Sequence, residues 1–76
     1  IKIYAYRNNF IGIFNKKIYV TSIYDKGVTS NKNNFYIEWE NNNVAYLSFY
    51  VKEKECKKFK ITFGNEIVIT HETLIK

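Results

Sequence analysis

The feature that most constrains this chain is an alternation of apolar and polar side chains that repeats every second residue along most of its length. Residues 35–39 and 45–51 show it most clearly, and the apolar positions are rich in aromatic and β-branched side chains. Because successive side chains of a β-strand point to opposite faces of a sheet, a period of two predicts strands with one buried face. We therefore expect an all-β protein.

The central hairpin has the clearest predicted register. A three-residue loop over the asparagines at 41–43 places every large apolar group of both strands on one face. The expected pairs are Trp39 with Ala45, Ile37 with Leu47, and Phe35 with Phe49. We expect this face, joined by Ile61 and Phe63, to form the centre of the core.

The last hairpin presents a conflict between its turn residues and its apolar pattern. Gly64-Asn65 is suited to a two-residue turn, but that register would place Phe63 beside Glu66. A three-residue loop over 64–66 instead pairs Phe63 with Ile67, and Ile61 with Ile69. Burial of these side chains outweighs a turn preference of about 1 kcal/mol, so we expect the longer loop, with Phe59 opposite His71.

The first hairpin is less well defined because both of its faces carry apolar groups. Asparagine tolerates a positive φ, so Asn8-Asn9 is the expected turn. That turn places Ile3 opposite Phe14 on one face, and Tyr4 opposite Ile13 and Tyr6 opposite Ile11 on the other. The connection at 15–17 then leads into a third strand over 18–24.

Two polar stretches interrupt the pattern. Residues 25–34 have no apolar period and are expected to form a long loop, a common place for a binding surface. Residues 52–58 form a run of charges that predicts a strand end, a turn or one helical turn.

At 76 residues the chain holds one small domain, 1–76, and the alternation predicts six to seven short strands in a small antiparallel barrel or sandwich. The order strand, long loop, strand, tight turn, strand from Ile18 to Val51 also occurs in SH3-like barrels. That order carries no diagnostic motif and therefore predicts no family. The chain starts at Ile1 and contains no methionine, which is compatible with its being cut from a longer protein.

The net charge of +5 suggests an anionic partner, but the composition offers a simpler explanation. Of 12 basic residues only Arg7 is arginine, and the chain also carries 10 asparagines, 7 tyrosines and 11 isoleucines. AT-rich genomes over-use lysine, asparagine, tyrosine and isoleucine. A solvated lysine surface is therefore the favoured interpretation, and a phosphate-binding surface is the alternative.

The sequence contains few residues that could support catalysis. The chain has one histidine, His71, which is expected beside Phe59, and one cysteine, Cys56, which is expected to be an exposed thiol among lysines. It has no glycine-rich phosphate loop and no metal-ligand spacing. We expect no enzyme activity, no metal and no cofactor.

Binding is the remaining class of function. Tyrosines combine a large contact area with a low entropic cost, and several of them are expected to point outward. The favoured hypothesis is a protein-interaction module that uses this sheet face and the 25–34 loop, with the candidate residues Tyr4, Tyr6, Tyr36, Tyr46, Tyr50, Lys26 and Lys32. The alternative is a nucleic-acid-binding domain that uses the lysines Lys52, Lys54, Lys57, Lys58 and Lys60 together with exposed aromatic rings. Carbohydrate binding by exposed aromatic rings would need an extracellular setting, for which the sequence gives no support.

The sequence also allows an expectation about where in the cell the protein is located. It contains no run of about 18 apolar residues, so no membrane span is expected. A single cysteine, with no signal peptide and no glycosylation acceptor in the sequence, favours an intracellular setting. An extracellular setting stays open, as does the oligomeric state.

Overall fold

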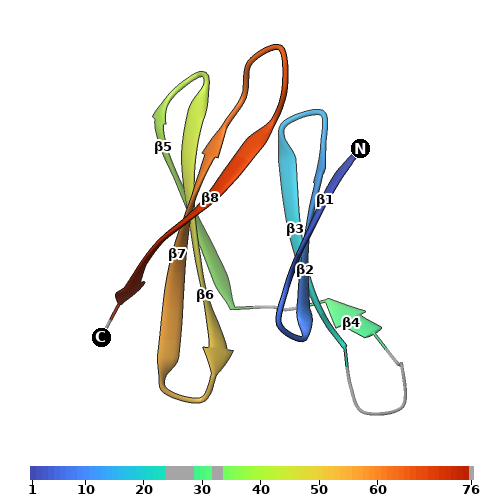
Figure 1. The fold of residues 1–76 in the computed structure, drawn as a ribbon, viewed down its shortest axis with the longest axis vertical. Coiled ribbons are helices and arrows are strands. Elements are labelled where there is room, and N and C mark those ends of the chain that lie inside the picture. The colour runs from blue at the N-terminus through green and yellow to red at the C-terminus, as the bar shows by residue number, and fades with distance from the viewer. Residues whose placement is uncertain (24–28, 32–33, 76) are drawn as a thin grey trace. The chain divides into compact units, whose positions relative to one another are not determined.

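The computed structural model describes residues 1–23, 29–31 and 34–75, the side chains of 29–31 and 73–75 excepted (Figure 1). The described chain is all-β, as the alternation predicted. It has seven strands of five to nine residues and one of three, where six to seven strands were expected. It forms two compact units, Ile1–Asn33 and Asn34–Lys76, and each contains one antiparallel sheet. No helix long and apolar enough to cross a membrane occurs in the described part of the chain.

The strands follow the order of the chain within each sheet. The first sheet contains β1 (Lys2–Tyr6), β2 (Asn9–Phe14), β3 (Lys17–Ile23) and β4 (Thr29–Asn31). The second contains β5 (Phe35–Asn41), β6 (Val44–Lys52), β7 (Glu55–Thr62) and β8 (Val68–Ile75). Among the described residues no strand pairing joins β1 to β4 or β5 to β8, so neither sheet closes and the barrel alternative is not observed.

The register of the second sheet confirms the predicted strand pairings, but neither predicted three-residue loop: the first turn is Asn42-Asn43, and residues 63–67 connect β7 to β8, so Phe63 and Ile67 do not pair. Phe35 pairs with Phe49, Ile37 with Leu47, and Trp39 with Ala45. A bulge between Trp39 and Asn41 takes up the extra residue of the asparagine loop, where the Asn43 N–H donates to Asn41 Oδ1 at 2.7 Å. In the last hairpin Ile61 pairs with Ile69 and Phe59 with His71, so burial did prevail over the shorter turn.

The register of the first hairpin was predicted wrongly. The turn lies at Arg7-Asn8, one residue earlier than expected, so that Tyr4 pairs with Ile11 and Ile3 with Gly12. Arg7 takes a φ of 53°, a left-handed conformation that a side-chain-bearing residue rarely adopts. This register moves Asn9 from the expected turn into β2, where it is buried and its Oδ1 accepts a hydrogen bond from Ser22 Oγ at 3.0 Å.

Two of the polar stretches also differ from expectation. Within 25–34, expected to be one loop, residues 29–31 form the short strand β4 and pair with β3, while 25–28 and 32–33 lie outside the described residues. In the charge run, β6 continues to Lys52 and β7 begins at Glu55, so a two-residue turn and two strands replace the option of a helical turn.

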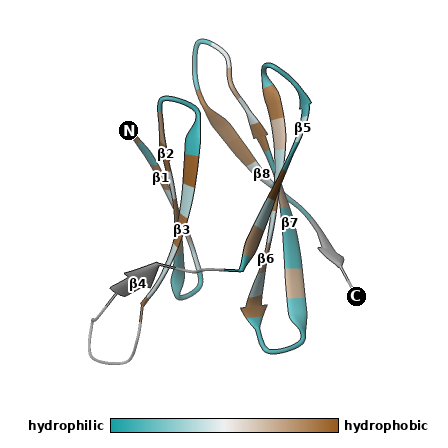
Figure 2. Ribbon diagram, turned by 180° about the vertical axis from the view of Figure 1, so that it is seen from behind, coloured by the Kyte–Doolittle hydropathy of each residue, from teal (hydrophilic) through white to brown (hydrophobic). Residues whose placement is uncertain are grey.

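The core lies along one face of each sheet, and apolar and polar residues follow one another along the same strands (Figure 2). The most deeply buried residues of the second unit lie on its two central strands and the turn that follows them: Ala45, Leu47, Phe49, Phe59, Ile61 and Phe63. In the first unit they are Ile11, Ile13, Ile18 and Val20.

The strand β5 departs from the expected core. Ile37 and Trp39 remain 37% and 43% exposed and Phe35 is only half-buried, although Trp39 stacks on Phe63 with ring centroids 5.3 Å apart. The reason is that β5 is an edge strand, so its side chains have neighbours on one side only, whereas those of β6 and β7 have neighbours on both. The face was predicted correctly, but the depth of burial was not.

Candidate binding surfaces

The second sheet carries three of the candidate tyrosines on the face opposite its core. Cross-strand rows define this face: Glu38, Tyr46 and Lys60 form one row, and Tyr36, Ser48 and Lys58 form the next. Tyr50 follows on the same side of β6. We call these seven residues the tyrosine face.

The tyrosine face combines exposed rings with nearby charges of both signs. Tyr36 is 69% exposed and Tyr50 is 47% exposed, whereas Tyr46 is half-buried. The Lys58 ammonium lies over the Tyr46 ring, 4.7 Å from its centroid, which is cation–π geometry. Glu38 lies directly opposite Tyr46 on the other side of the row. The face is thus an aromatic surface of mixed charge.

The five lysines of the nucleic-acid alternative do not form one surface. Lys58 and Lys60 belong to the tyrosine face, but Lys57 pairs with the fully buried Phe49 and so lies on the opposite side of β7. Lys52 and Lys54 lie at the turn between β6 and β7. The phosphates of one nucleic-acid strand could therefore contact only some of these five lysines.

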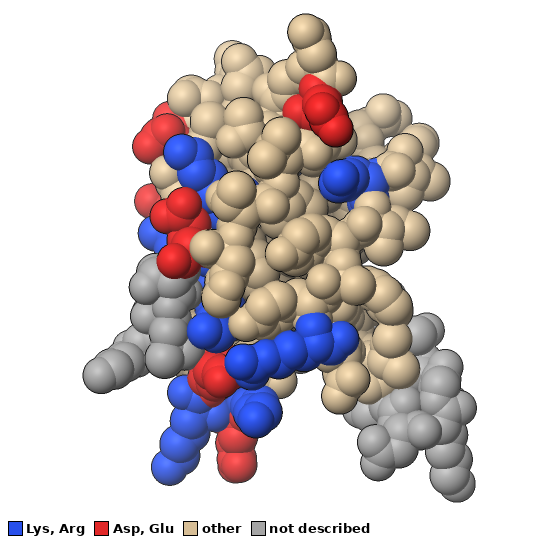
Figure 3. All heavy atoms as spheres, viewed as in Figure 1, with Lys and Arg blue, Asp and Glu red and all other residues tan. Residues whose placement is uncertain are grey.

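The turn between β6 and β7 is also electrically balanced. Lys52 and Lys54 alternate there with Glu53 and Glu55, and these residues line one shallow depression. Figure 3 shows acidic and basic side chains intermingled at the end of the molecule where Figure 1 places this turn. Adjacent carboxylates weaken the attraction of these lysines for an anion.

The remaining candidates lie elsewhere. Tyr4 and Tyr6, which we considered as outward-pointing, are half-buried on the face of the first sheet that carries Ile11, and the Arg7 guanidinium lies 5.3 Å from the Tyr6 ring centroid. They belong to a different sheet from Tyr36. Lys26 and Lys32 lie outside the described residues.

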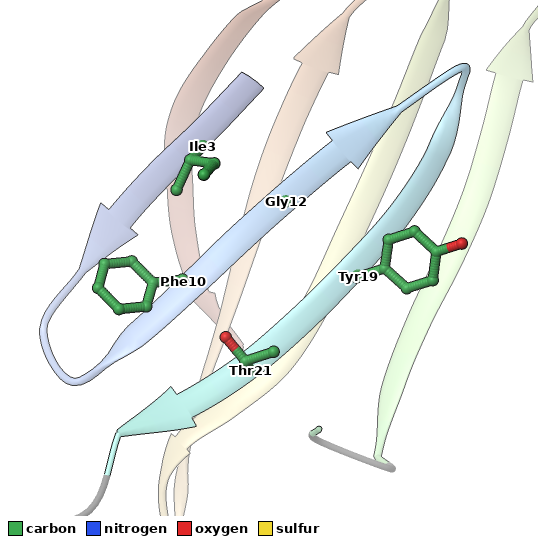
Figure 4. Close-up of a pocket in the computed structure, with 5 residues that line it drawn as sticks. All are labelled: Ile3, Phe10, Gly12, Tyr19 and Thr21. Atoms are coloured by element: carbon green, nitrogen blue, oxygen red, sulfur yellow. The ribbon is translucent and has the colours of Figure 1, made fainter. Parts of the chain in front are cut away.

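An apolar hollow that the sequence did not predict lies on the other face of the first sheet (Figure 4). Its volume is about 370 Å³, and Ile3, Phe10, Tyr19 and Thr21 surround Gly12. Gly12 pairs with Ile3 on one side and Tyr19 on the other, so the missing side chain leaves the space between them open. A glycine inside an apolar strand is the sequence signal for such a gap.

The two reactive side chains occupy different environments. His71 is exposed beside Phe59, with ring centroids 5.4 Å apart, as its register predicted. Cys56, expected to be exposed, is instead buried, at 8% exposure, in the cross-strand row of Tyr50. Its burial removes the access on which thiol reactivity depends. The absence of enzyme activity stays a prediction.

The chain has no significant match among known protein family models, curated protein sequences or solved structures. Any functional interpretation therefore rests on its own surfaces.

Proposed function

We propose that the chain is a binding module without enzyme activity that recognises another protein through the tyrosine face. The observation that carries this proposal is the presence of Tyr36, Tyr46 and Tyr50 on one sheet face, opposite the core. Tyrosine has only two rotatable side-chain angles, so little side-chain entropy is lost when such a ring is buried on binding.

The charges around these rings favour a protein as the partner. Glu38 lies between Tyr36 and Glu40 along β5 and opposite Tyr46, where it would repel a phosphate. Lys58 and Lys60 lie on the same face. Protein surfaces present both signs of charge and can match such a pattern, whereas a nucleic acid backbone presents only one.

One observation favours nucleic acid as the second candidate. The register places Lys58 and Lys60 in the same cross-strand rows as Tyr36 and Tyr46, so cations and stacking rings share one surface. Single-stranded nucleic acids bind to such combinations of rings and cations. The proposal of a protein partner and this alternative predict different responses to salt.

The test compares matched variants of the whole chain in a pull-down from cell extract followed by a direct binding measurement on the captured protein. Tyr36→Ala/Tyr50→Ala removes the two most exposed rings of the tyrosine face. Tyr19→Ala is the control, because Tyr19 is 52% exposed but lies on the first sheet. Lys58→Gln/Lys60→Gln removes the positive charges of the tyrosine face.

We expect the double tyrosine variant to lose binding at least tenfold, while Tyr19→Ala and the lysine variant stay within about threefold of the unmodified chain. Circular dichroism should show all variants folded, since none of these residues is in the core. In parallel, binding of single-stranded DNA and RNA oligonucleotides is measured at low and high salt. Strong oligonucleotide binding that falls steeply with salt and requires Lys58 and Lys60 would replace this proposal with the nucleic-acid alternative.

A further inference from the structure

The strand β5 forms an edge of the second sheet that carries few of the features that normally protect such edges. Among the described residues it is hydrogen-bonded to β6 on one side only. The bulge of β5 lies near the end of the strand, between Trp39 and Asn41, so residues 35–39 form a regular stretch. This stretch contains no proline and no lysine, and Tyr36, Ile37 and Trp39 are exposed large side chains. Edges with these properties pair readily with another strand.

The other strands at the sheet edges differ. β4 is only three residues long, β1 includes Lys2, and the bulge of β8 lies in the middle of the strand, between His71 and Thr73. Short length, lysine and bulges each discourage pairing with a further strand. Pairing through backbone groups is therefore most favourable at β5.

The hydrogen-bond pattern shows which backbone groups of β5 face away from β6. The Phe63 N–H donates to the Asn43 carbonyl at 2.7 Å, so residues 43, 45, 47 and 49 direct their backbone groups toward β7. Tyr46 and Ser48 consequently direct theirs toward Glu38 and Tyr36. The N–H and C=O groups of residues 35, 37 and 39 therefore point outward.

We propose that β5 pairs with β5 of a second copy of this chain, antiparallel and centred on Ile37. This register places Ile37 opposite Ile37 and Phe35 opposite Trp39 of the second copy. All the outward backbone groups of residues 35, 37 and 39 then meet their counterparts, giving roughly six inter-chain hydrogen bonds.

The side chains are also complementary in this register. Tyr36 lies opposite Glu38 of the second copy, so a hydroxyl meets a carboxylate, and an aromatic pair forms between Phe35 and Trp39. A pairing centred on Glu38 instead of Ile37 would place Glu38 opposite Glu38 of the second copy, where like charges repel. Charge and packing thus select the Ile37-centred pairing.

The proposed dimer has a consequence for the tyrosine face. A twofold axis between two antiparallel strands of one sheet is perpendicular to that sheet, so the tyrosine faces of both copies lie on the same side. The dimer would join them into one surface with twice the number of rings. The self-association itself does not depend on the proposed protein partner, and its test uses none.

The test measures the molar mass of the whole chain by light scattering and sedimentation from low micromolar to millimolar concentration. An interface of one short strand per copy falls below the roughly 1,200 Å² of stable complexes, so we expect dimers that dissociate on dilution. Ile37→Pro removes an outward N–H without touching the β6 pairing and should leave a monomer. Ile37→Thr keeps the N–H and should dimerise within about tenfold of the original affinity.

Cysteine cross-linking tests the register even where the proline variant fails to fold. In the Cys56→Ala background, Ile37→Cys places two thiols across a pair with Cα atoms about 5.5 Å apart, within disulfide range. Glu40→Cys is the control, because residue 40 of the two copies would be roughly 20 Å apart at about 3.3 Å per residue. We expect rapid oxidation to a covalent dimer for Ile37→Cys alone.

Two results would overturn the proposal. The first is a chain that stays monomeric at millimolar concentration. The second is equal cross-linking at residues 37 and 40, which would show random collision or a different register. If the chain is monomeric and Ile37→Pro instead abolishes capture of another protein, this edge serves a different partner and the homodimer is excluded.

Discussion

Replacing Leu47 with alanine should be far more damaging than replacing its cross-strand partner Ile37. Leu47 is 0% exposed and pairs with Ile37 on one side and Phe59 on the other. Leu47→Ala removes three carbon groups, and at about 0.8 kcal/mol each this lowers the free energy of unfolding by about 2.4 kcal/mol. The cavity left between the paired strands raises this loss to about 3 to 4 kcal/mol. A chain of this length has a free energy of unfolding of roughly 4 to 11 kcal/mol, so Leu47→Ala consumes a large part of it.

Ile37→Ala removes a similar number of atoms, but Ile37 is already 37% exposed at the sheet edge. Solvent fills the vacated space without a cavity, so we expect a loss of about 1 to 2 kcal/mol. At about 4 to 8 °C per kcal/mol, the melting temperature of Leu47→Ala should fall well below that of Ile37→Ala.

The assay is urea and thermal unfolding followed by circular dichroism and by Trp39 fluorescence. It is carried out at low micromolar concentration, where the self-association proposed above is dissociated. Equal losses for the two variants would refute the reasoning, because they would show that β5 is as well covered as β6 in solution.

Four further predictions concern stability. Gly12→Ala should raise the free energy of unfolding by about 0.5 to 1 kcal/mol in urea melts, because a Cβ at Gly12 meets nothing within 4 Å and strand glycines cost entropy. Lys16→Gly should raise the melting temperature by a few degrees, equivalent to roughly 1 kcal/mol, since Lys16 holds a φ of 61° in the two-residue turn Asn15-Lys16 between β2 and β3. Ser22→Ala should cost about 1 to 2 kcal/mol, because its hydroxyl donates to buried Asn9; a neutral result would show that this bond contributes nothing. Finally, we expect residues 1–76 to unfold in a single transition with coincident fluorescence and circular dichroism curves, and two separate transitions would contradict a single domain.

The sequence determined the strand content and the pairing of the second sheet. Its strands carry large apolar groups at every second position, so a shift of the pairing register by one residue would expose all the apolar side chains of a strand to solvent. That penalty was large enough to predict the pairing of Ile37 with Leu47, and to decide the last hairpin against its turn residues.

The first hairpin lacked this constraint. A displacement of the turn by one residue moves the pairing by two residues, so every side chain keeps its expected face and changes only its partner. Because both faces carry apolar side chains, burial did not distinguish the two registers. Turn preference alone favoured Asn8-Asn9, whereas the structure uses Arg7-Asn8 with a positive φ at Arg7. Gly12 signals a gap in the strand, but only the observed register places that gap between Ile3 and Tyr19 and so forms the hollow.

Only the tertiary structure decided how deeply each residue is buried and which surface residues are neighbours. Alternation assigns Ile37 and Leu47 to one face, but it cannot tell an edge strand from a central one, because that depends on what pairs on the other side. Alternation also places Lys57 and Lys58 on opposite faces of β7, but only the pairing of β7 with β6 brings Lys58 to Tyr46. Local sequence fixes the direction of a side chain within its strand, and the neighbouring strands determine what it contacts.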